Sequence, residues 1–111
     1  MSGLLSSASA LALSGMNAAS ARAAARAQNV SNMLTPGYRS AEVIQSSTQA
    51  GPTVTVSAPP PVSPVPPGLF ADVDLPRELV DLQMAKRAFQ ASAAVFKTAD
   101  EMSDAAIDLL G

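Results

Sequence analysis

The chain has 111 residues, of which 48% are hydrophobic but only 4% are aromatic and 14% are charged. A chain of this length can form at most one modest hydrophobic core. It contains no histidine, cysteine or tryptophan, so it lacks the commonest general base, the thiol nucleophile, imidazole and thiolate metal ligands and any disulfide bond, which argues against most enzyme chemistry.

The net charge of −2 is unevenly distributed along the chain. Residues 1–41 carry Arg22, Arg26 and Arg39 and no acidic residue, whereas residues 69–111 carry eight acidic and four basic residues. We therefore expect the two ends of the chain to attract each other. Three arginines are too few to neutralise many phosphates, so no nucleic-acid partner is expected.

The first residues are only mildly apolar and are interrupted by serines. A secretory signal peptide needs a basic region, a continuous apolar core and a cleavage site, so we expect the chain to begin as mature protein. No run of about 18 uninterrupted apolar residues predicts a transmembrane helix.

The N-terminal segment, residues 1–35, predicts a long helix of small side chains. Apolar residues recur every three or four positions over 3–34 and share one helical face: Leu5, Ala8, Ala12, Met16, Ala19, Ala23, Ala27, Val30 and Leu34. Because alanines bury little area, this helix needs several packing partners to be stable. Gly15 weakens it further, by about 1 kcal/mol relative to alanine.

A turn and a short hairpin are expected after this helix. Proline disfavours a helical conformation at Thr35, and Pro36-Gly37 suits the central positions of a type II turn. Two β-like stretches, over 39–45 and 53–57, predict a hairpin joined by the residues between them.

The proline-rich stretch at residues 58–68 predicts a polyproline II spacer about 30 Å long. The alternative is a ligand for a proline-recognition domain. Together, the turn, the hairpin and this spacer make up a linking segment over residues 36–71.

The C-terminal segment, residues 72–111, predicts a long heptad helix. Asp74 suits its N-cap, and Pro76 suits its first turn. Apolar residues recur with a mean spacing of about 3.5, the coiled-coil period: Leu75, Leu79, Leu82, Ala85, Phe89, Ala93, Phe96, Ala99, Met102, Ala106 and Leu110. A second apolar row indicates contacts with more than one neighbour: Val80, Met84, Ala88, Ala91 and Val95.

No catalytic, cofactor-binding or metal-ligating residue is proposed from the sequence. Asp100, Asp104 and Asp108 share a helical face, but nothing else supplies the roughly six oxygens that calcium requires, so a solvated acidic face is favoured. The serines have no histidine or partnered lysine to activate them.

Neither helix can bury its apolar stripe alone, which suits a polymer subunit whose copies bury one another's stripes. A soluble helical adaptor or chaperone-like binding module, holding one partner helix on its Phe89 and Phe96 face, is the alternative. An enzyme is a more distant third.

Two blocks of sequence resemble the bacterial flagellar rod and hook proteins. Residues 12–39 are similar to the N-terminal signature of that family, with Gln28-Asn29-Val30-Ser31-Asn32 followed by Thr35-Pro36-Gly37-Tyr38. Residues 72–110 look like its C-terminal helix, with Lys86-Arg-Ala-Phe-Gln and Thr98-Ala-Asp-Glu-Met102. The short middle of the chain is most similar to a short proximal-rod type.

The resemblance implies a mainly α fold, in which long N- and C-terminal helices pack as an antiparallel coiled-coil-like pair around a short β-like and proline-rich middle. It implies a non-enzymatic subunit of the flagellar basal-body rod that polymerises through its terminal helices and transmits torque. The rod lies in the periplasm, and its subunits pass through the flagellar type III export apparatus without a cleaved signal peptide.

Two sets of residues are expected to matter for this function. The assembly interface is expected on the C-terminal helix, at Leu79, Leu82, Phe89, Phe96 and Met102. The family turn motif comprises Asn29, Asn32, Thr35, Pro36, Gly37 and Tyr38. The implied partners are copies of the chain, other rod proteins, and membrane-ring and export-gate components, with no cofactor, nucleic acid or small-molecule substrate.

Overall fold

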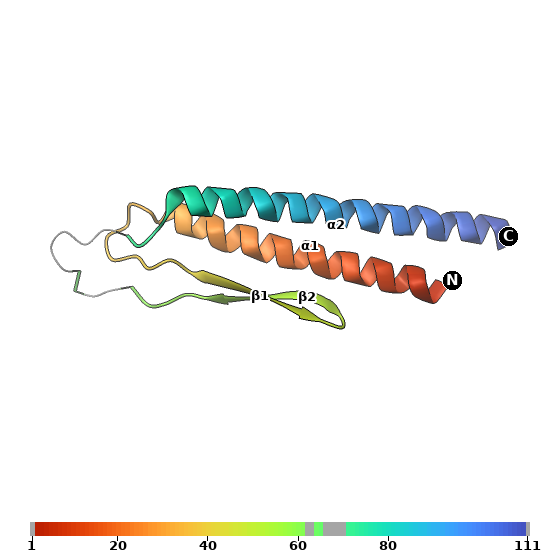
Figure 1. Ribbon diagram of the computed structural model, residues 1–111, viewed down its shortest axis with the longest axis horizontal. Helices are drawn as coiled ribbons and strands as arrows, with labels where there is room; N and C mark the ends of the chain where they lie inside the picture. Colours follow the sequence, from red (N-terminus) through yellow and green to blue (C-terminus); the bar gives the residue numbers. More distant parts are fainter. Residues whose placement is uncertain (1, 62–63, 66–70, 111) are drawn as a thin grey trace.

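The computed structural model describes residues 2–61, 64–65 and 71–110 and is 71 × 22 × 16 Å in extent. Two long helices, α1 (Ser2–Ser31) and α2 (Leu75–Leu110), pack side by side and run antiparallel (Figure 1). A hairpin of β1 (Glu42–Thr48) and β2 (Gly51–Ser57) lies along α1, on the side away from α2. The predicted fold, a pair of long terminal helices with a short β-like middle, is confirmed.

Small side chains form most of the core of α1. Ala12, Ala18, Ala19 and Ala25 are all at least 94% buried. The prediction of one continuous stripe over 3–34 was partly wrong, because the hairpin covers a second side of α1 beside Ala18 and the stripe residue Ala27 is exposed.

The helix also ends earlier than the stripe predicted, at Ser31. The backbone tightens there, since the amides of Met33 and Thr35 donate to carbonyls only three residues back, those of Val30 and Asn32. Such bonds close the last turn of a helix and stop its propagation. Leu34, beyond this point, is 86% exposed.

The hairpin is longer, and its loop shorter, than the sequence predicted. Strands β1 and β2 pair from Glu42 opposite Ser57 to Thr48 opposite Gly51, which leaves a loop of two residues. The Thr48 hydroxyl donates to the Gly51 carbonyl at 2.7 Å, and Gly51 adopts a φ of +115° that side chains rarely tolerate. The two strands therefore continue into residues 46–48 and 51–52, which we expected to be part of the loop.

Packing against α1 supports this two-stranded sheet, which would be marginal alone. The Ser14 hydroxyl donates to the Pro52 carbonyl at 2.9 Å, and the Arg22 guanidinium donates to the Gln45 side chain at 3.2 Å. Both strands are therefore attached to the same helix.

The predicted type II turn is confirmed. The Tyr38 amide donates to the Thr35 carbonyl at 3.2 Å, and Gly37 has a φ of +78°. After the turn, the chain runs beside the segment that leads into α2, where the Asp72 amide donates to the Tyr38 carbonyl at 2.8 Å and the Ser40 hydroxyl donates to the Asp72 carbonyl.

Asp74 caps α2 as predicted, because its carboxylate accepts a hydrogen bond from the Arg77 amide at 3.3 Å. Part of the predicted polyproline spacer, residues 62–63 and 66–68, lies outside the described residues. Within the described part of the chain, no helix combines the length and apolar character needed to cross a membrane.

Candidate functional site

The family turn motif lies where α1 ends, and its side chains bond both to one another and to groups outside the motif. The Asn32 amide group donates to the Gln28 carbonyl at 2.9 Å. The Thr35 hydroxyl donates to the Asn32 side-chain oxygen at 3.3 Å. Pro36 is exposed and Gly37 is buried. This part of the motif fixes the direction in which the chain leaves the helix.

Asn29 differs from the rest of the motif, because its side chain is fully buried and makes four hydrogen bonds. Its Nδ2 donates to the Ala41 carbonyl and to Glu78 Oε2, both at 3.1 Å. Its Oδ1 accepts from the Tyr38 hydroxyl at 2.8 Å and from the Ala41 amide at 2.9 Å. An asparagine side chain has two donor hydrogens and two acceptor lone pairs. Asn29 therefore uses its full capacity to join α1, the turn, the start of β1 and α2.

Glu78 is the other buried member of this cluster, with 3% exposure. Arg26 pairs with it at 3.3 Å through Nη1 and with Asp81 at 3.0 Å through Nη2. One arginine on α1 thus holds two carboxylates on α2. A buried carboxylate needs such partners, because an unpaired charge is costly to remove from water.

Sequence reasoning did not single out Glu78 or Asp81. The available signal was the basic N-terminal third and the acidic C-terminal third, which predicted attraction without naming a pair. The Arg26 ion pairs confirm that attraction.

Tyr38 also belongs to this cluster, because its hydroxyl donates to Asn29. Burial raises the pKa of its phenol, and the negative charge of Glu78 raises that pKa further. Both effects disfavour the phenolate. Tyr38 thus remains a hydrogen-bond donor to Asn29 over the physiological pH range.

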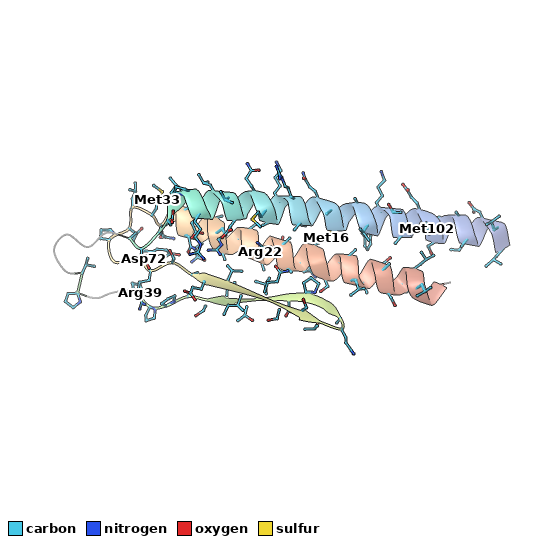
Figure 2. All side chains as sticks on the ribbon, viewed as in Figure 1. Met16, Arg22, Met33, Arg39, Asp72 and Met102 are labelled. Atoms are coloured by element: carbon cyan, nitrogen blue, oxygen red, sulfur yellow. The ribbon has the colours of Figure 1, made fainter. Side chains whose placement is uncertain are left out.

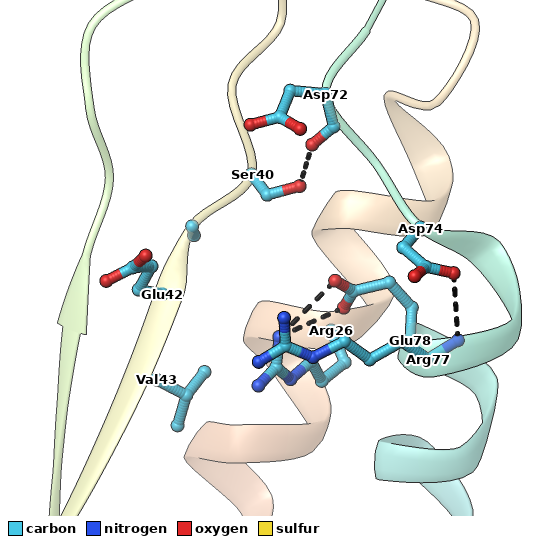
Figure 3. Close-up of a pocket in the computed structure, with 9 residues that line it drawn as sticks. Arg26, Ser40, Glu42, Val43, Asp72, Asp74, Arg77 and Glu78 are labelled. Carbon is cyan, nitrogen blue, oxygen red and sulfur yellow. Dashed lines mark hydrogen bonds and ion pairs between the residues drawn. The ribbon is translucent and has the colours of Figure 1, made fainter.

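A polar hollow of about 300 Å³ adjoins this cluster (Figure 3). Its lining consists of Arg26, Ser40, Ala41, Glu42, Val43, Asp72, Asp74, Arg77 and Glu78. Several of these groups are already engaged, as the Arg26 to Glu78 pair and the Asp74 cap show. Across residues 2–61, 64–65 and 71–110, no three acidic side chains are grouped so as to hold a metal ion. The arrangement suits a structural joint between α1, β1 and α2.

The expected assembly residues lie along α2 and are not gathered at one point (Figure 2 shows Met102 near the far end of α2). Leu79, Phe89, Phe96 and Met102 are 38–51% exposed, and Leu82 is half-buried. Since a helix rises about 1.5 Å per residue, this set extends over roughly 35 Å.

The second apolar row of α2 is also accessible. Val80, Met84 and Val95 are 52–57% exposed. The buried residues of α2, namely Glu78, Ala85 and Ala99, lie on the helical face between this row and the side that carries Leu79 and Phe89, at about 100° per residue. Helix α2 therefore has exposed apolar side chains on both sides of its contact with α1.

Most of the sequence that matches a known protein family lies in α2. Residues 70–109 match the family described as flagellar basal body rod FlgEFG protein C-terminal. This match supports a flagellar rod protein family for the chain. No curated protein matches it as a relative.

The matched region contains all of α2 except its last residue, Leu110. It therefore includes the five expected assembly residues, together with Glu78 and Asp81 of the polar cluster. Asn29 and the turn motif lie outside the matched region, so their similarity to the rod proteins rests on the motif itself.

The match supports a structural role in the flagellar basal-body rod. The family is a structural rod component and not a class of enzymes. The match also supports a location in the basal body and assembly with other flagellar rod proteins.

Proposed function

We propose that this protein is a subunit of the flagellar basal-body rod that polymerises through its terminal helices and transmits torque. The observation that supports this most is the pair of exposed apolar rows on α2, one on each side of its contact with α1. A helix that buried all its apolar side chains within the monomer would have no such rows.

Burial of these rows between subunits would add to the stability of each subunit. The buried apolar residues of the described chain are all alanines, and apolar burial contributes only about 25 cal/mol per Å². The larger side chains Phe89, Phe96 and Met102 remain accessible. Neighbouring subunits that cover them would stabilise each fold and the polymer together.

Torque transmission requires that each subunit keep its shape under load. The Asn29 cluster joins both helices to the turn and the first strand, and Arg26 joins α1 to α2 twice. Close-packed helices deform little. We assign residues 1–35 and 72–111 to the rod wall and residues 36–71 to the linking segment between them.

The proposal includes a periplasmic position and export through the flagellar type III apparatus without a cleaved signal peptide. Its partners would include membrane-ring and export-gate components as well as rod proteins. Leu79, Leu82, Phe89, Phe96 and Met102 would form the interface.

The test is electron microscopy of basal bodies purified from cells that carry a tagged copy. Label on the rod is the expected result, and a tagged unrelated periplasmic protein is the control. If the label is absent from basal bodies and the purified protein forms only small, discrete oligomers, an adaptor function replaces this proposal.

A further inference from the structure

One side of α2 has an ordered distribution of charge. Lys86 and Lys97 are exposed in its middle. Four exposed acidic residues follow toward its end: Asp100, Glu101, Asp104 and Asp108. At about 100° of rotation per residue, all six lie within roughly 100° of one another around the helix. This side is thus basic in the middle and acidic at the end.

Lys86 also borders two adjoining hollows between the helices, of about 390 and 460 Å³. Ala23 on α1 lines both of them. Phe89 lines the first, and Leu79 and Leu82 line the second. We call this surface the Lys86 groove. It combines an apolar floor with a positive charge at its rim.

The acidic end of α2 has the complementary character. Ile107 is 63% exposed and shares a side of the helix with Asp100 and Asp104. Lys86 and Asp104 are 18 residues apart, as are Phe89 and Ile107, which corresponds to about five complete turns. A shift of this length therefore brings Asp104 level with Lys86 and Ile107 level with Phe89 on the same side.

We propose that the acidic end of α2 docks in the Lys86 groove of a second copy of this chain, with the two α2 helices parallel and staggered by about 27 Å. This inference rests on the proposed polymerising function and specifies which surfaces meet. Packing in register would set Asp104 against Asp104 and Lys86 against Lys86, and like charges repel. In the staggered arrangement Lys86 of one copy faces Asp104 of the other, so attraction replaces both repulsions. Phe89 of the first copy then covers Ile107 of the second.

The contact is directional, because groove and acidic end lie at different heights on one helix. Each copy that uses its acidic end leaves its own groove free for the next copy. Such heterologous contacts do not close and instead generate extended assemblies. An antiparallel pair would also join Lys86 to Asp104, but it would use both sites of both copies and stop at a dimer.

The absence of cysteine from the chain allows a direct test by disulfide cross-linking. The purified full-length variant Lys86→Cys/Asp104→Cys is oxidised and resolved on a non-reducing gel. A ladder of multimers is expected. A product that stops at the dimer overturns the parallel stagger in favour of the antiparallel pair.

The matched control is Arg87→Cys/Asp104→Cys. Arg87 is exposed but lies about 100° around the helix from Lys86. We expect at least a fivefold lower yield of multimers from this control. Equal yields, or no multimers from either variant, overturn the proposal.

Charge reversal provides an independent measurement by sedimentation of the cysteine-free protein. Lys86→Glu should weaken association roughly two- to fivefold, the range expected for an exposed ion pair. Lys86→Glu/Asp104→Lys should restore it, whereas Arg87→Glu should leave it unchanged. No loss with Lys86→Glu, or no recovery in the double variant, contradicts the pairing.

Failure here is distinguishable from failure of the proposed function. Tagged wild-type protein on the rod, combined with an absent ladder, rejects the Lys86 groove alone. Absence of the wild-type protein from basal bodies rejects the rod function itself.

Discussion

Gly15 on α1 lies directly against Ser92 on α2. A Cβ atom built on Gly15 would lie 2.5 Å from Ser92 Oγ and 3.4 Å from Ser92 Cβ. Glycine costs about 1 kcal/mol relative to alanine within a helix. The structure gives this cost a reason, because the missing side chain lets the helices approach closely at this point.

A large side chain at position 15 should therefore destabilise the fold. Gly15→Leu should lower the free energy of unfolding by about 1–3 kcal/mol, the usual range for overpacking. Gly15→Ala should have little effect, because the Ser92 hydroxyl can rotate away and the helix gains propensity. Gly15→Ala/Ser92→Ala should raise the free energy of unfolding by about 0.5–1 kcal/mol.

Urea unfolding followed by circular dichroism measures these differences. Gly3→Leu is the matched control, because an added Cβ at Gly3 meets nothing within 4 Å. Equal unfolding midpoints for Gly3→Leu and Gly15→Leu would show that α1 and α2 do not approach at Gly15.

Replacement of Asn29 should be among the most damaging single changes. Asn29→Ala removes the hydrogen-bond partner of Tyr38, of Glu78 and of both backbone groups of Ala41. Since each unsatisfied buried polar group costs about 1–3 kcal/mol, we expect a loss of at least 2 kcal/mol in the free energy of unfolding. Asn29→Asp should not restore stability, because it places a second carboxylate beside Glu78.

Asn17→Ala is the control for this substitution, since Asn17 lies on the same helix but is exposed. Urea unfolding should show a change of less than about 0.5 kcal/mol for this variant. A similar change in both variants would contradict the structural role assigned to the buried cluster.

The titration of Tyr38 should report on the same cluster. Burial and the charge of Glu78 raise its pKa, so its absorbance change near 295 nm should occur above the usual pH of about 10. The chain has one tyrosine and no tryptophan, so the signal has a single source.

The sign of the stability effect follows from this shift. The folded state holds the Tyr38 proton more tightly than the unfolded state. The resulting stabilisation is complete below the unfolded-state pKa and is lost as pH rises through the folded-state pKa. Glu78→Gln should lower the Tyr38 pKa toward its usual value. An unchanged titration in that variant would exclude Glu78 as a cause.

Several elements of this structure could be predicted from local sequence alone. The Asp74 cap, the type II turn at Pro36-Gly37 and the existence of both helices depend on neighbouring residues, so their patterns could be read directly. The hairpin loop was misjudged because its closure depends on Gly51, which lies against Ser14 and Leu11 of α1. That contact belongs to the tertiary structure.

The buried cluster around Asn29 also depends on tertiary contacts that local sequence does not reveal. Asn29 and Glu78 are 49 positions apart, and no periodicity relates them. The turn motif drew attention to Asn29, and the charge distribution indicated attraction between the ends. Neither could show that a fully satisfied asparagine lies beside a buried, arginine-paired carboxylate.

Phe89 and Phe96 should separate the stability of the monomer from its assembly. They are 41% and 38% exposed, so Phe89→Ala or Phe96→Ala should lower the free energy of unfolding of the monomer by only about 1 kcal/mol. In a filled interface the same truncation typically costs about 3–5 kcal/mol. Each variant should therefore be expressed and exported normally but recovered poorly in purified basal bodies.

Urea unfolding and immunoblots of basal bodies measure the two effects side by side. Ile44→Ala is the matched control, because Ile44 is an apolar residue that is 54% exposed but lies on β1 instead of α2. It should assemble as the unsubstituted protein does. If the double variant Phe89→Ala/Phe96→Ala is incorporated normally into rods and supports normal motility, this side of α2 is not the assembly surface, and the large side chains there need another explanation.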